Sequence, residues 1–356
     1  MILTVLSFII VLGILIFVHE FGHYIVAKKV DIRVEEFALG FGPRLFSRKK
    51  GETVYSLRAV PLGGFCNMTG EFVPDEEMDD EERQIYEEAK ERGRCFHQQP
   101  LYQRFLVVFM GPMMNFLLAF MLFIIIFVGF GLPVGDLDST VIGGVSPGQP
   151  AAEAGLTAGD EIRSIAGRSV SSWEDIQQQI RSFAPGQEIE IELLREGEEI
   201  SVVLAPEEQQ GYPMIGITPE TYRESIGVIS AVIRGAEESW LITSMIARGF
   251  GQMLTGGLTA DDIGGPVMIA SMAGDAARQG LDIVMRFTAV ISINLGIINL
   301  LPIPALDGGR ILFMIIEGIR RKPIDPRKEG LVHLIGFVIL MVLMVFIIFL
   351  DIWTLF

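Results

Sequence analysis

The sequence predicts a polytopic α-helical membrane protein with four transmembrane helices, a membrane-associated β-hairpin region and one inserted, mainly β domain. Half of the 356 residues are apolar, and the mean hydropathy is positive. Four stretches also reach the length of about 20 largely apolar residues that a spanning helix needs. These stretches are residues 3–27, 105–130, 283–301 with an apolar continuation at 311–319, and 331–350.

The chain divides accordingly into transmembrane, loop and inserted segments. The first stretch has neither a basic n-region nor a small-residue cleavage site, so we expect it to be retained as a helix. The predicted segments are a first transmembrane helix (1–30), a cytoplasmic loop with a β-hairpin and an acidic insert (31–103), a second transmembrane helix (104–130), the inserted domain (131–208), amphipathic membrane-surface helices (209–282), a third, broken transmembrane segment (283–319), a basic cytoplasmic loop (320–330) and a fourth transmembrane helix (331–356).

Basic residues predict the orientation of these segments. Clusters of Lys and Arg follow the first span and separate the last two, which places both loops in the cytoplasm by the positive-inside rule. Residues 131–282 contain no lysine and many acidic residues, so we expect the inserted domain and both termini on the extracytoplasmic side. The net charge of −16 argues against nucleic acid as a partner. The two cysteines, Cys66 and Cys95, fall in a cytoplasmic loop and fit no disulfide or Cys-type zinc pattern.

The loop after the first span predicts a hairpin followed by an acidic segment. Residues 53–57 and the following RAVPLGGF have the pattern of short strands joined by turns. The acidic stretch 75–94 lacks an apolar stripe, which predicts a solvated helix or a flexible insert.

The inserted domain has the alternation of a small β fold. Strands are predicted at 141–145, 188–194 and 199–204, with a turn at Glu196 and Gly197 and a helix at 173–182. The run PAAEAGLTAGDEI between these signals resembles a bacterial PDZ domain over about seventy residues. Residues 225–256 are apolar but interrupted by charges, which predicts amphipathic helices on the outer membrane surface, with a fifth span as the alternative.

The first span contains the run VHEFGHY, whose residue types and spacing predict a metal site. At 100° per residue, His19 and His23 lie one turn apart on one helical face, so both imidazoles can bind one zinc ion while Glu20 acts as the general base. A chance match and hydrogen-bonded buried histidines are the alternatives. Placing these groups in a membrane helix is costly, which favours a functional site. His23 and His19 lie roughly 8 and 14 Å inside the basic boundary of this helix, near the cytoplasmic face.

Asp307 is the predicted third zinc ligand. It is the carboxylate at similar depth on another span, and the run LLPIPALDGG around it opens the backbone within the membrane, which is tolerated where a cavity is lined. The alternative for Asp307 is a helix N-cap. Two other histidines are alternative ligands. His97 lies in a polar loop, which predicts a surface position, and His333 lies at the start of the fourth span with no second ligand at a suitable spacing.

The chain resembles the site-2 protease family of intramembrane zinc metalloproteases, in its bacterial, RseP-like branch with one PDZ domain. The matching runs are HEFGH, GPMMNF at 111–116, the PDZ-like unit and SINLGIINLLPIPALDGG at 292–309. The resemblance implies a multi-pass protein of the bacterial plasma membrane and one zinc ion. It also implies that Asn299, and less directly Asn294, binds substrate or the oxyanion. Interhelical hydrogen bonding explains Asn294 and Asn115 equally well.

The resemblance implies proteolysis within the bilayer. Substrates would be transmembrane helices of single-span proteins, such as anti-sigma factors or remnant signal peptides, trimmed first by another protease. The hairpin offers an edge strand that captures the unwound substrate, and the PDZ-like domain filters substrates by recognition or exclusion. The alternatives are a zinc sensor or transporter in the membrane, and a PDZ scaffold without protease activity.

Overall fold

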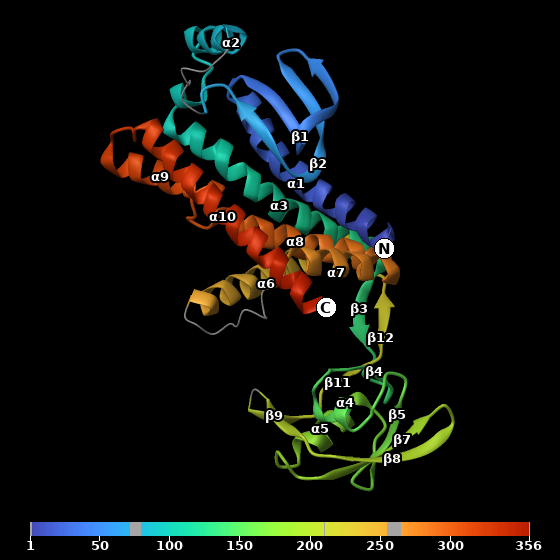
Figure 1. Cartoon of the computed structure of the whole chain (residues 1–356). Coiled ribbons are helices and arrows are strands. Elements are labelled where there is room, and N and C mark those ends of the chain that lie inside the picture. The colour runs from blue at the N-terminus through green and yellow to red at the C-terminus, as the bar shows by residue number, and fades with distance from the viewer. Residues whose placement is uncertain (1, 72–79, 210, 255–264, 356) are drawn as a thin grey trace. The chain divides into compact units, whose positions relative to one another are not determined.

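The computed structural model describes residues 2–71, 80–209, 211–254 and 265–355, which form two compact units (Figure 1). The first unit joins Met1–Phe127 to Gly227–Phe356, and the second is Val128–Ile226. The first unit contains the long helices and the hairpin, whereas the second contains the short strands of the inserted domain.

Four helices in the described part of the chain are long and apolar enough to cross a membrane, as many as the sequence predicts. They are α1 (Ile2–Lys29), α3 (Leu101–Phe130), α8 (Leu281–Leu300) and α10 (Pro326–Leu355). Helix α9 (Asp307–Arg320) follows the break after α8 and is not one of these four. Large apolar side chains remain exposed along α1, α3 and α10, as expected of surfaces that face lipid, whereas most described residues of α8 are buried or half-buried.

Helices α1 and α3 approach closely because glycine occupies their contact. A Cβ atom on Gly22 of α1 would lie 2.4 Å from the carbonyl oxygen of Met110, and a Cβ on Gly111 of α3 would lie 2.3 Å from the His23 ring. Small residues at such crossings let the backbones of membrane helices come together. This contact brings α3 directly beside the HExxH face of α1.

The hairpin consists of two long, bent antiparallel strands, β1 (Val34–Lys50) and β2 (Thr53–Met68). Residues 36–39 of β1 pair with 54–57 on one side and with 64–67 on the other. The prediction of two short strands within 53–65 is therefore wrong in extent. Glycines at positive φ (Gly40, Gly42 and Gly63) allow the bends that a regular alternation does not reveal.

Segment 64–68 of β2 forms an edge of this small sheet in the described part of the chain. Its inner side pairs with 34–39, and no other described strand pairs with β1 or β2. Gly64 lies against α1, since a Cβ there would lie 2.8 Å from the Ile16 side chain and 3.3 Å from Cγ of Glu20. The edge of the hairpin therefore runs beside the proposed general base.

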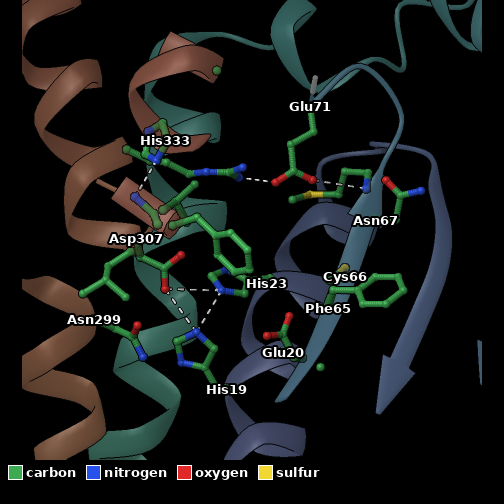
Figure 2. Close-up of a pocket in the computed structure, with 18 of the residues that line it drawn as sticks. His19, Glu20, His23, Phe65, Cys66, Asn67, Glu71, Asn299, Asp307 and His333 are labelled. Carbon is green, nitrogen blue, oxygen red and sulfur yellow. Dashed lines mark hydrogen bonds and ion pairs between the residues drawn. The ribbon is translucent and has the colours of Figure 1, made fainter. Parts of the chain in front are cut away.

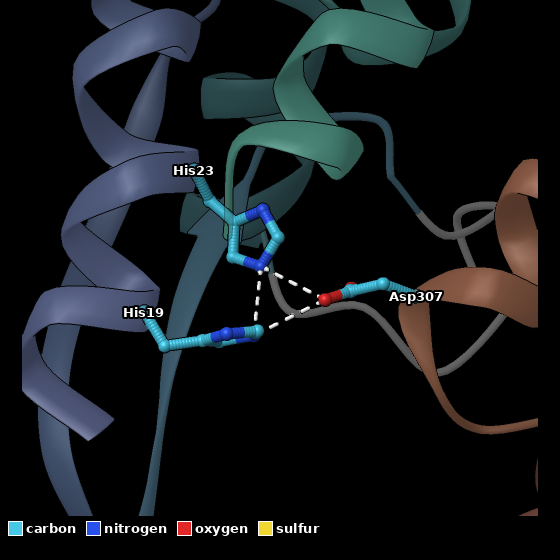
Figure 3. Close-up of side chains that lie close together, drawn as sticks. All are labelled: His19, His23 and Asp307. Atoms are coloured by element: carbon cyan, nitrogen blue, oxygen red, sulfur yellow. Dashed lines mark hydrogen bonds and ion pairs between the residues drawn. The ribbon is translucent and has the colours of Figure 1, made fainter. Parts of the chain in front are cut away.

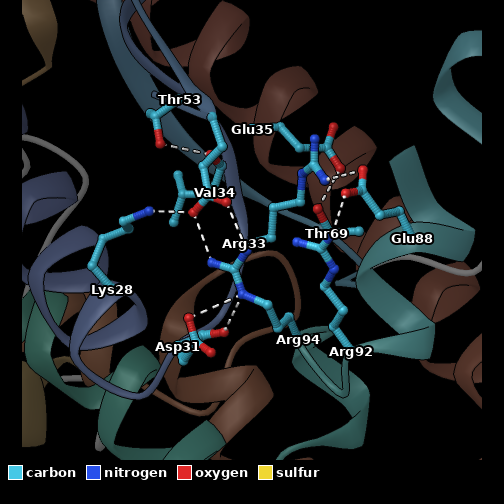
Figure 4. Close-up of polar contacts among 11 residues, drawn as sticks. Lys28, Asp31, Arg33, Val34, Glu35, Thr53, Thr69, Glu88, Arg92 and Arg94 are labelled. Carbon is cyan, nitrogen blue, oxygen red and sulfur yellow. Dashed lines mark hydrogen bonds and ion pairs between the residues drawn. The ribbon is translucent and has the colours of Figure 1, made fainter. Parts of the chain in front are cut away.

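A cluster of charged and polar groups ties the end of α1 to the hairpin turn (Figure 4). Arg94 donates to both oxygens of Glu52 at 2.7 and 2.8 Å and pairs with Asp31 at 2.9 Å. Lys28 pairs with the same Glu52 carboxylate. The hydrogen bonds from Arg94 lower the pKa of Glu52, and the Lys28 contact lowers it further. Together they outweigh burial, which would raise it, and bring the pKa to about 2. The cluster fixes the hairpin relative to helix α1.

The acidic segment forms a helix where it is described. Helix α2 covers Asp80–Glu91, which confirms the helical alternative, while residues 75–79 lie outside the described part. A short 3-10 turn, η1 (Phe96–Gln98), then leads into α3. Cys66 and Cys95 are both free and buried.

The inserted unit has two helices and several short strands, and it is longer than predicted. Its strands are β3 (Leu132–Gly135), β4 (Ile142–Val145), β5 (Glu161–Ile165), β6 (Arg168–Ser169), β7 (Ile189–Arg195), β8 (Glu198–Leu204), β9 (Glu207–Gln209), β10 (Tyr212–Met214), β11 (Ile217–Pro219) and β12 (Thr221–Glu224). The boundary lies near 226 rather than 208, because β11 pairs with β4 and β12 with β3. These late strands are too short to show a period of two.

The order of the remaining elements in this unit matches the prediction. Strands β6, β5, β7 and β8 form a four-stranded sheet in that order, with helices α4 (Pro150–Glu153) and α5 (Trp173–Arg181). The core is apolar and is centred on Trp173, Ile162 and Ile191. Arg195 binds the buried Asp160 through both carboxylate oxygens at 2.7 Å, which keeps that charge paired.

Residues 225–256 contain one long helix, α6 (Val228–Leu254), rather than several helices. It is not among the four described helices that are apolar enough to span a membrane. Trp240 and Ile229 on α6 are largely exposed, whereas Glu238 pairs with Arg286 of α8 at 3.5 Å. Helix α7 (Pro266–Gln279) packs against α1 and α8. These features favour the amphipathic interpretation over a fifth span.

Candidate metal centre and active site

Helix α1 presents two histidines towards one point (Figure 3). His19 and His23 are both buried, and their Nε2 atoms lie 3.3 Å apart. The rings are perpendicular, at an interplanar angle of 84°. A spacing of four residues places the two side chains on the same face of an α-helix, one above the other. The predicted convergence of the two imidazoles is therefore present.

Asp307 reaches the same point from a break in the helical backbone. Helix α8 ends at Leu300, and α9 begins at Asp307 with Leu306 as its N-cap and no side-chain capping bond. The N-cap alternative for Asp307 is therefore wrong. Its Oδ2 atom lies 3.1 Å from Nε2 of His19 and 3.5 Å from Nε2 of His23.

Glycines and one strained residue shape the break that carries Asp307. A Cβ on Gly308 would lie 2.1 Å from the carbonyl oxygen of Leu301, and a Cβ on Gly309 would lie 2.5 Å from that of Ile303. Ala305 adopts a φ of +78°, which a residue with a side chain rarely tolerates. The run PIPALDGG thus folds back on itself, and only glycine fits at its two final positions.

The three side chains fit a zinc ion. Their ligand atoms all lie within 4.8 Å of one another, and Oδ2 of Asp307 is buried without a hydrogen-bond partner among the described residues. Two imidazole nitrogens and a carboxylate oxygen form a donor set that zinc accepts, with one position left open in catalytic sites. A carboxylate that faces two imidazoles without a hydrogen bond is explained by a cation between them.

Helix α3 holds the far side of both imidazoles. Nδ1 of His23 lies 2.9 Å from the carbonyl oxygen of Val107, and the Asn115 amide lies 3.1 Å from Nδ1 of His19. The Asn115 side chain is fully buried, and its Oδ1 has no partner among the described residues. The oxygen and nitrogen of an Asn amide are assigned from the hydrogen bonds they make. With the amide reversed, Nδ1–H of His19 donates to Oδ1 of Asn115, which then has a partner. Both histidines then present Nε2 to the metal, as ligand-orienting partners require.

A cavity of about 670 Å³ opens beside the three ligands (Figure 2). Glu20 and Asn299 line it, together with residues 64–68 of strand β2. Figure 2 shows Asp307 and Asn299 on one side of the histidines, and Phe65 and Cys66 on the other. A peptide chain placed in this cavity would therefore pass between the metal ligands and the hairpin edge.

The other predicted candidates lie elsewhere or in new roles. Asn294 is half-buried on α8 and does not line the described cavity. His97 is exposed and bonds the carbonyl oxygen of Gly70 at 3.1 Å, as the surface interpretation expects. His333, by contrast, lines the cavity. Burial raises the pKa of the Cys66 thiol, so this residue of the cavity wall stays a neutral thiol.

Sequence reasoning missed an ion pair in the cavity wall. Arg310, one turn after Asp307 on α9, pairs with Glu71, which follows strand β2. Glu71 also accepts from the backbone of Met68 at 3.4 Å. The only sequence signal for this ion pair is the presence of two opposite charges near apolar segments. The pair links the break that carries Asp307 to the hairpin.

Comparisons with known proteins agree with this geometry. The family model described as "Peptidase family M50" matches residues 7–343. "Zinc metalloprotease RasP" of Geobacillus kaustophilus is 37% identical, with 98% of this chain and 97% of the relative covered. "Regulator of sigma-W protease RasP" of Bacillus subtilis is 34% identical, with 99% of both chains covered. "Probable protease eep" of Enterococcus faecalis is 34% identical, with 98% of both covered.

A solved structure is similar to part of the chain. It is the PDZ domain of an SdrC-like protein from Listeria monocytogenes, which is 27% identical and has a TM-score of 0.22. The match covers 23% of this chain and 87% of that domain.

Proposed function

Because this chain belongs to peptidase family M50, and is thus a zinc metalloendopeptidase of the site-2 protease type, we propose that it cleaves transmembrane segments of single-span membrane proteins within the bilayer. The observation that supports this proposal is that His19, His23 and Asp307 converge beside a cavity of about 670 Å³, whose walls come from candidate membrane-spanning helices, strand β2 and the break before α9. Family membership favours this proposal over a zinc sensor, a transporter or a PDZ scaffold.

Each residue of the site has a proposed role. His19, His23 and Asp307 hold one zinc ion. Bound there, zinc supplies Lewis acidity and brings the pKa of a water molecule near neutrality. The Glu20 carboxylate, next to His19 and in the same cavity, accepts a proton from the attacking water and passes it to the amine that leaves. The Asn299 amide, which also lines the cavity, donates to the oxygen that becomes negative.

Strand β2 provides the surface on which substrate is held extended. A helical substrate protects its carbonyls in intrahelical hydrogen bonds, so it has to unwind before attack. Segment 64–68 has an edge unpaired by any described strand and lines the cavity opposite Asp307. Addition of the unwound segment to this edge satisfies its backbone groups and presents a peptide bond to the metal centre.

Orientation and substrate selection follow from charge and from the inserted domain. We place the hairpin and the metal centre near the cytoplasmic face, and the PDZ-like unit and both termini outside, because clusters of Lys and Arg lie in the hairpin and follow α9. The PDZ-like unit would then admit substrates already trimmed on the outer side by another protease. One relative is named as a regulator of sigma-W, which favours anti-sigma factors as substrates, with remnant signal peptides as a second class.

Mapping the cleaved bond tests this function. Purified protein in proteoliposomes is given a single-span reporter whose outer part is already short, and the products are identified by mass spectrometry. The proposal expects cleavage inside the apolar segment, on its cytoplasmic half, and no cleavage after chelation of zinc. Cleavage confined to the soluble flanks of the reporter would contradict it.

A second experiment tests the filter. Deleting residues 139–205 removes most of the PDZ-like unit, while substrates of two lengths differ only in the outer part. The proposal expects wild-type protein to prefer the trimmed substrate and the deletion variant to cleave both at similar rates. Unchanged discrimination in the variant would show that selection occurs elsewhere.

A further inference from the structure

His333 connects the fourth membrane helix to the break that carries Asp307. Its side chain belongs to α10 and is buried, with 9% of its surface exposed. Nδ1 of His333 lies 2.9 Å from the backbone nitrogen of Ala305. Ala305 is the residue with the positive φ two positions before Asp307. A Cβ on Gly336 would lie 2.5 Å from Pro304, so α10 lies directly against this break.

The Ala305 contact fixes where the imidazole proton lies. A backbone N–H can only donate, so Nδ1 of His333 has to offer its lone pair. A ring that accepts through Nδ1 carries its proton on Nε2. The imidazole packs against the ring of Phe313 with centroids 5.6 Å apart, which restricts its rotation. His333 is therefore held as a donor with a defined direction.

The Nε2–H group has no partner among the described residues. Nε2 is buried without a hydrogen bond, and His333 lines the same cavity as Glu20, Asn299 and Asp307. A buried donor without a hydrogen-bond partner is destabilising. The cost is offset when a ligand with an acceptor oxygen enters the cavity.

We propose that His333 donates a hydrogen bond from Nε2 to a backbone carbonyl oxygen of the substrate peptide in the cavity. This role rests on the proposed function, because an unwound transmembrane segment brings carbonyl groups that have lost their intrahelical partners. The cationic donor of the same wall, Arg310, already faces the Glu71 carboxylate. His333 supplies a neutral donor, which suits an uncharged carbonyl. Its bond to Ala305 couples substrate binding to the segment that positions Asp307.

Binding is measured on the Glu20→Gln background, so that turnover does not interfere. His333→Asn retains an acceptor near the Nδ1 position and removes the donor, whereas His333→Gln extends an amide donor to the Nε2 position. A fluorescent single-span peptide serves as the probe. We expect about tenfold weaker binding for His333→Asn, consistent with one lost hydrogen bond, recovery to within about threefold for His333→Gln, and unchanged zinc content in both variants.

Two results would overturn the assignment. Wild-type affinity in His333→Asn would show that Nε2 donates to nothing in the substrate. Loss of zinc in His333→Asn would show that His333 acts only by positioning Asp307. Failure of the proposed function would give a different result from both. The wild-type protein would then cleave its substrate outside the apolar segment.

A substrate series avoids any effect of substitution on folding. Peptides in which single backbone carbonyls are replaced by methylene groups are bound to the protein with His333 intact. We expect one position to lose about tenfold in affinity, and the same replacement to have no effect on His333→Asn. Equal losses in both proteins at every position would contradict the proposal.

Discussion

The convergence of His19 and His23 follows from their four-residue spacing. The orientation of each imidazole also depends on contacts with α3, which is distant in sequence. The predicted ligands converge because helical geometry fixes side-chain direction and depth in the membrane fixes which carboxylate can join them. The partners on α3 were less predictable. Asn115 had two equal interpretations, and the carbonyl of Val107 is available on any helix. His333 was set aside because ligand spacing along the chain says nothing about contacts made by the fold.

Asn115 orients His19, so its acceptor oxygen should control zinc affinity. Asn115→Leu removes the acceptor, and we expect zinc to bind about 10–100-fold more weakly. Asn115→Asp keeps an oxygen at the same place and should retain zinc. Competition with a chelator measures both affinities. Equal affinities for the Leu and Asp variants would contradict the orienting role.

At the scale of elements, the proposed metal site depends on how closely α1 and α3 approach. Gly111→Ala places a methyl group where a Cβ would lie 2.3 Å from the His23 ring. We expect loss of zinc and of cleavage in this variant. Gly129→Ala is the matched control, because it lies on the same helix with nothing within 4 Å of its Cβ. Zinc content measured on the purified variants decides. Full zinc content in Gly111→Ala would show that the close contact is dispensable.

The hairpin depends on a buried carboxylate, Glu36, whose side chain is 9% exposed. Burial alone would raise its pKa, but hydrogen bonds from Arg44, Ser56 and Arg58 lower it to about 2. Because the folded-state pKa is depressed, the stabilisation is present above the unfolded value of about 4.3 and is lost as pH falls towards 2.

Glu36→Gln should therefore destabilise the hairpin at pH 7 and leave it unaffected near pH 2. The difference in opening free energy between wild type and variant is measured by amide hydrogen exchange across β1 and β2. We expect this difference to shrink between about pH 4 and pH 2. A difference that stays constant over this range would show that the Glu36 charge does not stabilise the hairpin.

The hairpin also shows which parts of the fold sequence patterns do not predict. The strand at 53–57 has a recognisable signal, whereas β1 contains charges and glycines that mask its alternation. The pairing of 36–39 with two parts of β2 arises from bends at glycines, which no local period encodes. Helices α5 and α8 were predicted almost to the residue, because their apolar periodicity or length is set locally.

At the scale of the whole molecule, charge distribution predicts opposite sides for the two units. Single cysteines are introduced at Gln84 on α2 and at Ser171 in the PDZ-like unit, both exposed, and intact cells are treated with a membrane-impermeant maleimide. Native Cys66 and Cys95 are buried and should stay unlabelled. We expect labelling at 171 and none at 84 until the cells are opened. Labelling at 84 in intact cells would reverse the proposed orientation.

The central claim is that Glu20 moves the proton at a zinc site formed by His19, His23 and Asp307. The most direct measurement compares wild type with Glu20→Gln for cleavage of a transmembrane reporter, with zinc content determined on the same preparations. The account predicts that Glu20→Gln retains zinc and loses cleavage by several orders of magnitude. Cleavage at the wild-type rate in the zinc-loaded variant would contradict it.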